Sequence, residues 1–195
     1  MLDSVRTDGQ HINREGQHRK PSGRKVESSE VVNIDVSAEL DDYLRDSGAT
    51  FAVPAVDPLI EYLCQITLNA LNPAMEAVRA GAKVNPIGQA IEKTAIDAGF
   101  NTISARGSHG IGRSLHDESH FIQKCYDEKD TRTLSEGQVI TIEPFLSTGA
   151  EGTVTAYDGW ILLTGSGNRS TQSKHTMVST SGKPIALTTL LIQAN

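Results

Sequence analysis

Hydrophobic and polar positions alternate in two neighbouring segments, residues 31–36 and 43–53, as is typical of strands. The polar run at residues 40–42 between them is typical of a turn, so the pattern predicts a hairpin. Because successive side chains in a strand point to opposite faces, we expect Asp35 and Asp46 on one face, opposite or diagonal to each other. Like charges at this spacing predict a cation between them. The alternative is a pair of exposed aspartates beside an acidic turn.

After residue 57 the spacing of apolar positions changes from that of a strand to that of a helix. Asp57 followed by Pro58 is a helix start signal, and Pro73 is expected to break or kink the helix that follows. The Asn-Pro pair at residues 85–86 repeats this start signal, and Gly99 is a natural stop. The chain therefore predicts successive helices after the hairpin.

Short strand-like runs follow at residues 138–146, 153–163 and 176–180, with Gly, Asp and Ser between them. Strands, then helices, then more strands predict an α+β domain with a mostly antiparallel sheet and helices packed on one face. Residues 1–28 show little periodicity, so we expect a flexible or loosely ordered segment, either disordered or a loosely held strand and loop. Residues 29–195 are expected to form a single domain.

The composition disfavours several classes of protein. The net charge is -6 and the basic residues lie mostly near the front, which indicates a solvated segment rather than a nucleic-acid-binding surface. Cys64 and Cys125 lie far apart without a CxxC pattern, which suggests no disulfide framework and no cysteine metal site, and fits a reducing cytoplasm. No apolar run approaches the roughly 20 residues that span a bilayer, and no signal-peptide pattern is present. We therefore expect a soluble cytoplasmic protein that binds neither nucleic acid nor membranes.

Two histidines that bracket a glycine-rich turn, His109 and His116, are the clearest candidates for chemistry. Glu143 lies in an otherwise apolar run, where an ionised carboxylate needs a partner. His109 and Glu143, together with the two hairpin aspartates, form a candidate ligand set: Asp35, Asp46, His109 and Glu143. This set has several oxygen ligands and one nitrogen ligand, which suits Mn, Co, Fe or Zn. The alternatives are ordinary surface or core histidines and a glutamate satisfied by an arginine or by backbone donors.

Several motifs, in order along the chain, carry a resemblance to a known family. They are Val-Asn-Ile-Asp-Val at 32–36 with Ala-Thr-Phe at 49–51, His-Gly-Ile-Gly-Arg-Ser-Leu-His at 109–116, Thr-Ile-Glu-Pro at 141–144, Asp-Gly-Trp at 158–160 and His-Thr at 175–176. Over roughly residues 15–190, the chain thus resembles the type I methionine aminopeptidases. The resemblance implies the pita-bread (creatinase/aminopeptidase) fold of these metallopeptidases, N-terminally shortened because the family's helical front segment has no match here.

The resemblance also implies a pair of divalent ions with four protein ligands: Asp35, Asp46, His109 and Glu143. The ions would activate a water molecule and polarise the substrate carbonyl, with Glu143 taking the proton. His18 and His116 match substrate-side histidines that donate hydrogen bonds to charge developing on the peptide. Trp160 matches a residue near the methionine pocket. The implied substrate is the N-terminal methionine of peptides or nascent proteins.

One position departs from the family in a way that bears on activity. Lys174 stands where the family has a glutamate that bridges both metal ions. Three carboxylates and one ammonium sum to two negative charges, enough for one divalent ion. We therefore expect at most one ion and weak or absent peptidase activity, with the ammonium able to occupy the vacated metal position. The alternative is that Lys174 points to solvent and a neighbouring carboxylate substitutes.

These observations leave several functional hypotheses. The first is a methionine aminopeptidase-type enzyme that removes N-terminal methionine, impaired by Lys174. The second is a non-catalytic binding protein on the same scaffold, because a fold does not dictate its function. A third is another hydrolase of this fold, such as a proline-specific peptidase, and a gene product without function of its own is a fourth. Metal stoichiometry separates the first from the second.

Overall fold

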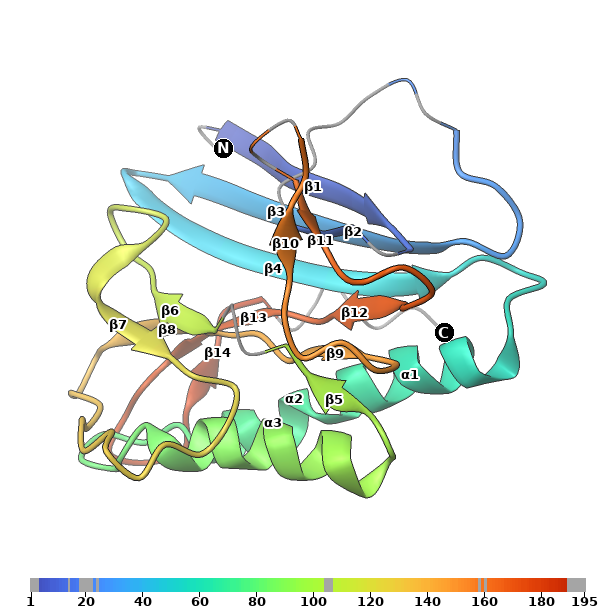
Figure 1. The fold of residues 1–195 in the computed structure, drawn as a ribbon. Coiled ribbons are helices and arrows are strands. Elements are labelled where there is room, and N and C mark those ends of the chain that lie inside the picture. Colours follow the sequence, from blue (N-terminus) through green and yellow to red (C-terminus); the bar gives the residue numbers. More distant parts are fainter. Residues whose placement is uncertain are drawn as a thin grey trace.

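The computed structural model describes residues 4–13, 15–17, 23, 25–103, 107–157, 159 and 161–188. Within this part of the chain, three helices lie along one side of the molecule, and the strands above them form four antiparallel sheets (Figure 1). The expected architecture, α+β with a mostly antiparallel arrangement of strands, is confirmed.

The predicted hairpin is present and forms most of the sheet farthest from the helices (Figure 1). This sheet has the order β1-β3-β4, from strands Ser4–Ile12, Val31–Leu40 and Tyr43–Ala52. Asp41 and Asp42 make the turn between β3 and β4 with φ of 51° and 65°. A two-residue turn with both φ angles positive matches the twist of the strands, and Asp tolerates this conformation. The turn therefore sets the register of the whole hairpin.

Helix α1 (Pro58–Asn69) begins where the sequence predicts, because the Asp57 side chain accepts a hydrogen bond from the Leu59 backbone N–H. The break that follows lies at Ala70, and Pro73 falls inside the first turn of the short helix α2 (Leu71–Glu76). Proline is tolerated in a first turn because it lacks only a donor that is unpaired there in any case. The break is thus confirmed, but it precedes the proline.

Helix α3 (Asn85–Asp97) also begins at its predicted start, although not through a side-chain cap. The Asn85 side chain donates to the backbone oxygens of Asp127 and Asp130 and accepts from the Asp127 N–H, so it holds a neighbouring loop instead. Gly99, with φ of 79°, follows the helix in the left-handed conformation expected of a stop.

The apolar run 138–146 is not one strand but two. Strand β8 (Val139–Ile142) and strand β9 (Phe145–Ser147) belong to different sheets, and Glu143 and Pro144 lie between them. A proline has no N–H for the ladder, so pairing stops at this point. The largest sheet has the order β14-β13-β8-β6-β7, from strands Ile185–Ala186, His175–Val178, β8, Ser108–Gly110 and Asp117–Ile122.

The remaining strands form two small sheets. One has the order β12-β9-β5, with β12 at Ser170–Gln172 and β5 at Asn101–Thr102. The other has the order β10-β11-β2, with strands Val154–Thr155, Leu162–Leu163 and Glu15–Gln17. The predicted run 153–163 is therefore a pair of short strands. Strands β1 and β2 lie in the segment for which the sequence allows either disorder or a strand and loop.

The hydrophobic core lies between the helices and the sheets that contain β8, β9 and β13. Its fully buried members include Leu63, Ile87, Ile91, Ile140, Ile142 and Leu146. Each such side chain contributes about 1.5–3 kcal/mol when it leaves water. The core therefore anchors the strands whose ends carry the candidate site. Among the residues described, no helix is long and apolar enough to cross a membrane.

Candidate metal centre

The hairpin brings Asp35 and Asp46 together on its inner face. Asp35 pairs with Gly48 and Asp46 with Ser37, so the two aspartates are diagonal neighbours across β3 and β4. Both are buried, with 6% and 2% of their surface exposed. The alternative of two exposed aspartates beside the turn is therefore wrong, and the predicted convergence of their side chains is confirmed.

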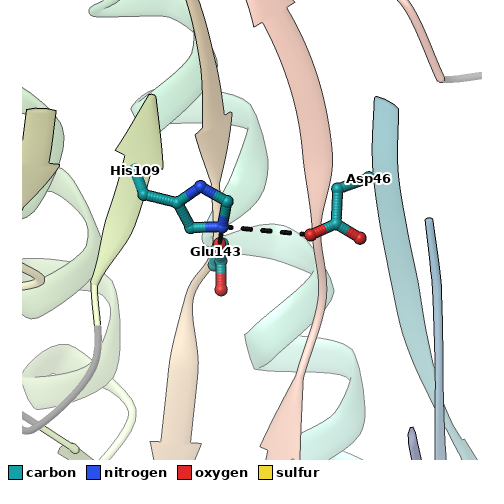
Figure 2. Close-up of side chains that lie close together, drawn as sticks. All are labelled: Asp46, His109 and Glu143. Atoms are coloured by element: carbon teal, nitrogen blue, oxygen red, sulfur yellow. Dashed lines mark ion pairs between the residues drawn. The ribbon is translucent and has the colours of Figure 1, made fainter. Parts of the chain in front are cut away.

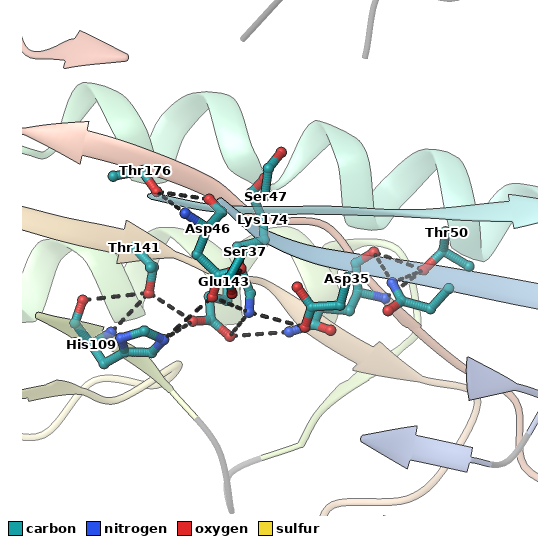
Figure 3. Close-up of polar contacts among 12 residues, drawn as sticks. Asp35, Ser37, Asp46, Ser47, Thr50, His109, Thr141, Glu143, Lys174 and Thr176 are labelled. Carbon is teal, nitrogen blue, oxygen red and sulfur yellow. Dashed lines mark hydrogen bonds and ion pairs between the residues drawn. The ribbon is translucent and has the colours of Figure 1, made fainter. Parts of the chain in front are cut away.

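The ammonium of Lys174 lies between these two carboxylates (Figure 3). Its Nζ donates to Asp35 Oδ2 at 3.0 Å and to Asp46 Oδ2 at 2.9 Å, and lies 3.6 Å from Glu143 Oε2. The Lys174 backbone is held to Gly48 by two hydrogen bonds, of 2.8 and 3.3 Å. Only 5% of this residue is exposed. The alternative that Lys174 points to solvent is therefore wrong, and its ammonium is the cation between the aspartates.

Glu143 and His109 form the other half of the cluster (Figure 2). His109 Nε2 lies 2.9 Å from Glu143 Oε1 and 3.9 Å from Asp46 Oδ2. Thr141 Oγ1 donates to Glu143 Oε1 at 2.6 Å, and Gln172 Nε2 donates to Glu143 Oε2 at 3.0 Å. Among the residues that the structure describes, the partners of this carboxylate are thus neighbouring side chains rather than an arginine or backbone donors.

The orientation of the His109 ring follows from its second nitrogen. Nδ1 lies 2.9 Å from the Gly110 carbonyl oxygen, which can only accept, so the hydrogen-bond network assigns a proton to Nδ1. Nε2 is then directed at Glu143 and Asp46. Fixing one ring nitrogen on a carbonyl and turning the other inward is how proteins orient histidines that bind metals.

The electrostatics of the cluster show an excess of negative charge. Burial raises the pKa of Asp46, and with Asp35 and Glu143 nearby it reaches about 7 despite the opposing charge of Lys174. Burial alone would lower the pKa of Lys174, but the three carboxylates raise it well above its ordinary value. Lys174 is therefore an ammonium at neutral pH, and Asp46 takes up a proton more readily than an ordinary aspartate.

The contact between Glu143 and His109 shifts their pKa values in opposite directions. Burial would raise the pKa of Glu143, but the charge of Lys174 and the hydrogen bond from His109 bring it well below the ordinary value. Burial would lower the pKa of His109, but the hydrogen bond and charge of Glu143 raise it above the ordinary value. Glu143 is therefore ionised at all ordinary pH values.

The donor set fits a divalent ion in its chemistry. Ligand atoms of Asp46, His109 and Glu143 all lie within 4.8 Å of one another, which makes a buried group of two carboxylates and one imidazole. Such a set suits Mn, Fe, Co or Zn. Asp35, predicted as a ligand, is not part of this group, and its Oδ2 accepts a hydrogen bond from the ammonium of Lys174. The place between the two aspartates is thus taken by a cation of the chain itself.

The other predicted site residues are less closely involved, or lie outside the part of the chain that the structure describes. His116 is exposed, and its ring centre lies 4.4 Å from that of His109, so it stands at the outer edge of the cluster. His18 and Trp160 are outside the described residues.

Two contributors, Thr141 and Gln172, were not among the predicted site residues. Each lies two positions before a cluster residue, Glu143 and Lys174 respectively, and period-two alternation in a strand is the signal that could have found them.

Comparisons with known proteins identify the family. The profile of metallopeptidase family M24 matches residues 11–181. The chain is 38% identical over 180 residues to methionine aminopeptidase 2 of Bacillus subtilis, covering 92% of this chain and 72% of that protein. The crystal structure of methionine aminopeptidase from Thermotoga maritima superposes with a TM-score of 0.86 at 28% identity, covering 92% of this chain and 72% of that one.

A more distant solved structure shows that the fold is shared more widely. The prolidase of Pyrococcus horikoshii superposes with a TM-score of 0.70 at 21% identity, covering 96% of this chain and 49% of that one. At this level of identity, the similarity shows only that the two proteins share a fold. The expected pita-bread fold is thereby confirmed. The chain therefore belongs to metallopeptidase family M24, and it is a type I methionine aminopeptidase-like protein.

Proposed function

We propose that this protein is a methionine aminopeptidase-type metallopeptidase that holds at most one divalent ion, and that Lys174 impairs its activity. The substrate would be the N-terminal methionine of peptides or nascent proteins, as the names of its relatives suggest. The observation that carries the proposal is the contact of one buried ammonium with three carboxylates that would otherwise serve metal ions.

Charge counting supports the limit of one ion. Asp35, Asp46 and Glu143 carry three negative charges and Lys174 carries one positive charge, which leaves two, the charge of one divalent ion. A second ion would have to share the oxygen atoms that Lys174 already contacts. At separations of about 4 Å, like charges repel by about 4 kcal/mol per unit-charge pair at an effective dielectric constant of 20.

The remaining donors could hold that one ion. Asp46, His109 and Glu143 would be its ligands. The chemistry supplied by a divalent ion at such a place is polarisation of a carbonyl and activation of water. Thr141 and Gln172 hold Glu143 in position by hydrogen bonds to its two oxygens.

His116, at the edge of the cluster, would donate a hydrogen bond to a bound peptide, and its ring contact with His109 supports this role. Glu143 would accept a proton during the reaction, and Lys174 would impair this step as well. Because the ammonium lowers the pKa of Glu143, this carboxylate is a weaker base than an unpaired glutamate.

A non-catalytic binding protein is the second candidate, favoured by the same contact. Lys174 already supplies the cation that the buried aspartates need, so the site can persist without a metal ion. In that case the protein would bind a partner without cleaving it. The cytoplasmic location expected from the cysteine usage remains a prediction.

The test compares wild type with Lys174→Glu after reconstitution with Mn²⁺ or Co²⁺. We expect the wild type to hold at most one ion and to cleave Met-Ala peptides weakly or not at all, and Lys174→Glu to gain an ion and activity. Lys93→Glu is the matched control, because Lys93 is exposed on α3, where its ion pair is with Asp97. Xaa-Pro peptides serve as the substrate control.

Two results would contradict the proposal. A wild-type protein that binds two ions and cleaves Met-peptides rapidly would show that Lys174 impairs neither metal binding nor catalysis. A wild type that binds no metal and a Lys174→Glu variant that neither binds nor cleaves would favour the binding protein instead.

A further inference from the structure

A cavity of about 440 Å³, which takes no part in the proposed function, borders strand β6, the strand that carries the histidine of the metal centre. Its walls come from three segments: the start of β4, the loop between β6 and β7, and the start of β8. The Leu44 N–H donates to the Gly112 carbonyl oxygen at 2.8 Å. The Ile111 N–H donates to the Val139 carbonyl oxygen at 3.2 Å. These backbone hydrogen bonds hold the three walls together, so the cavity is a fixed feature of the fold.

The floor of the cavity is apolar and its rim is charged. Ile111 is buried, and Val139 is half-buried. Tyr43, Arg113 and Asp117 are exposed, so the cavity opens to solvent between them. Small-molecule sites in proteins have volumes of roughly 300–1,000 Å³ and combine apolar walls with a few polar groups. The size and the lining are therefore those of a site for a small molecule.

Arg113 is held at the rim by Tyr43. Its guanidinium carbon lies 5.1 Å from the centre of the Tyr43 ring, and Nη2 donates to the Tyr43 hydroxyl at 3.4 Å. The contact with the ring restricts the long side chain of the arginine, and within the described part of the chain most of its N–H donors remain available. A planar guanidinium matches a carboxylate, which it can bind through two parallel hydrogen bonds. The rim therefore presents a positioned carboxylate-binding group.

Two further polar groups of the lining are open to a ligand. Asp117 Oδ1 accepts from Ser114 Oγ at 2.8 Å, and among the described residues no ion pair joins Asp117 to Arg113. Gln138 Oε1 accepts from the Ser135 N–H at 2.8 Å, whereas its Nε2 is buried and has no hydrogen-bond partner among the described residues. Buried donors in proteins are nearly always paired, so this one calls for an acceptor. The lining thus offers an anionic acceptor and an unmet donor beside the guanidinium.

We propose that this cavity binds a free α-amino acid with an apolar side chain. Arg113 and Gln138 donate to its carboxylate, and Asp117 accepts from its ammonium group. Ile111 and Val139 contact its side chain. A zwitterion suits the site because the lining carries one charge of each sign, whereas a simple carboxylate or a simple amine leaves one of them without a partner. The inference goes beyond the proposed function and does not depend on it.

The test is isothermal titration calorimetry of the full chain with L-leucine in the presence of EDTA. EDTA makes the measurement independent of any metal ion, and leucine is used rather than methionine so that the substrate of the proposed function does not contribute. We expect saturable binding of one L-leucine per chain. N-acetyl-leucine lacks the ammonium group and leucinamide lacks the carboxylate, so each should bind at least about tenfold more weakly.

Variants locate the bound amino acid. Arg113→Gln and Asp117→Asn each remove one charge from the rim and should each weaken L-leucine binding by at least about tenfold. Arg79→Gln is the matched control, because Arg79 is exposed and donates to the Ser181 carbonyl oxygen instead of lining the cavity; its affinity should stay within about twofold of wild type. Lys174→Glu changes the metal centre and should also leave leucine binding within about twofold. Circular dichroism confirms that each variant is folded.

The inference is overturned if the wild type does not bind L-leucine at millimolar concentrations, or if folded Arg113→Gln and Asp117→Asn bind it as tightly as the wild type. Loss of binding in Lys174→Glu together with normal binding in Arg113→Gln would place leucine at the metal centre and would also overturn it. The comparison of leucine with its two analogues uses the wild type alone, so it stands even if a variant does not fold. None of these results bears on the proposed function, which is tested by metal stoichiometry and Met-peptide cleavage.

Discussion

Replacing Lys174 with methionine tests whether its ammonium stabilises the fold as an internal counter-ion. Methionine has nearly the same length and is apolar, so the change removes the charge while largely filling the space. Asp35 and Asp46 then lose the donor that lies 3.0 and 2.9 Å away, and Glu143 loses a cation at 3.6 Å. Three buried carboxylates would be left facing one another without that positive charge.

Removing one partner from a buried ion pair typically costs about 3–5 kcal/mol. We expect the free energy of unfolding to fall by about that amount at pH 8, and the melting temperature to fall by roughly 6–20 °C. The assay is equilibrium unfolding in urea with EDTA present, so that no divalent ion replaces the ammonium. Lys93→Met, which breaks an exposed pair with Asp97, should cost no more than about 0.5 kcal/mol.

The pH dependence gives the second half of this test. In the wild type, the pKa of Lys174 is raised, so its contribution is complete below about pH 10.5 and is lost as the pH rises through the folded value. In the variant, uncompensated carboxylates have raised pKa values, and the folded state binds more protons than the unfolded state. The deficit should therefore shrink between pH 8 and pH 5. A variant within about 1 kcal/mol of wild type at pH 8, or a deficit that does not change with pH, would refute the reasoning.

Three further predictions concern the packing of the protein and a residue that contacts the metal centre. Gly88→Ala should destabilise the protein by about 3 kcal/mol in urea unfolding, because its Cβ would come within 2.5 Å of a backbone oxygen. Gly152→Ala, with open space around it, should change stability by less than about 0.5 kcal/mol. Thr141→Val should lower the free energy of unfolding by about 2–3 kcal/mol in the same assay, because it removes the acceptor of the buried backbone N–H of His109 and the hydroxyl that donates to Glu143. An unchanged unfolding midpoint would contradict this role. Burial raises the pKa of Cys64 to about 11, so its alkylation by iodoacetamide at pH 8 should be about a hundredfold slower than in urea, and equal rates would refute the burial of this thiol.

Much of the local structure could be predicted because its causes lie within a few residues of one another. Asp57 and Pro58 start α1 by a cap and a preset φ angle, both short-range effects. Asp41 and Asp42 form a two-residue turn, and once the turn is known, period-two alternation places Asp35 and Asp46 on the same face. The acidic pair of the site therefore follows from the hairpin alone.

Other features could not be derived in this way because they depend on which strands become neighbours. The run 138–146 is mostly apolar, and although Pro144 interrupts pairing, the assignment of β8 and β9 to different sheets depends on their different partners. Gln172 became recognisable as a partner of Glu143 only when β12 was seen to lie beside it. No local signal marks Lys124 as buried, since lysine is ordinarily a surface residue.

The sequence by itself determined the family, the hairpin that carries two aspartates, and the presence of a lysine at a position where the family has a glutamate. Only the tertiary structure decided where that lysine's charge lies. The backbone of Lys174 is bonded to Gly48, far away in sequence, and this contact delivers the ammonium to the carboxylates instead of to solvent. The physical reason is that a charge on a long flexible side chain has no preferred place until long-range contacts bury it, and then its energy depends on every charge around it.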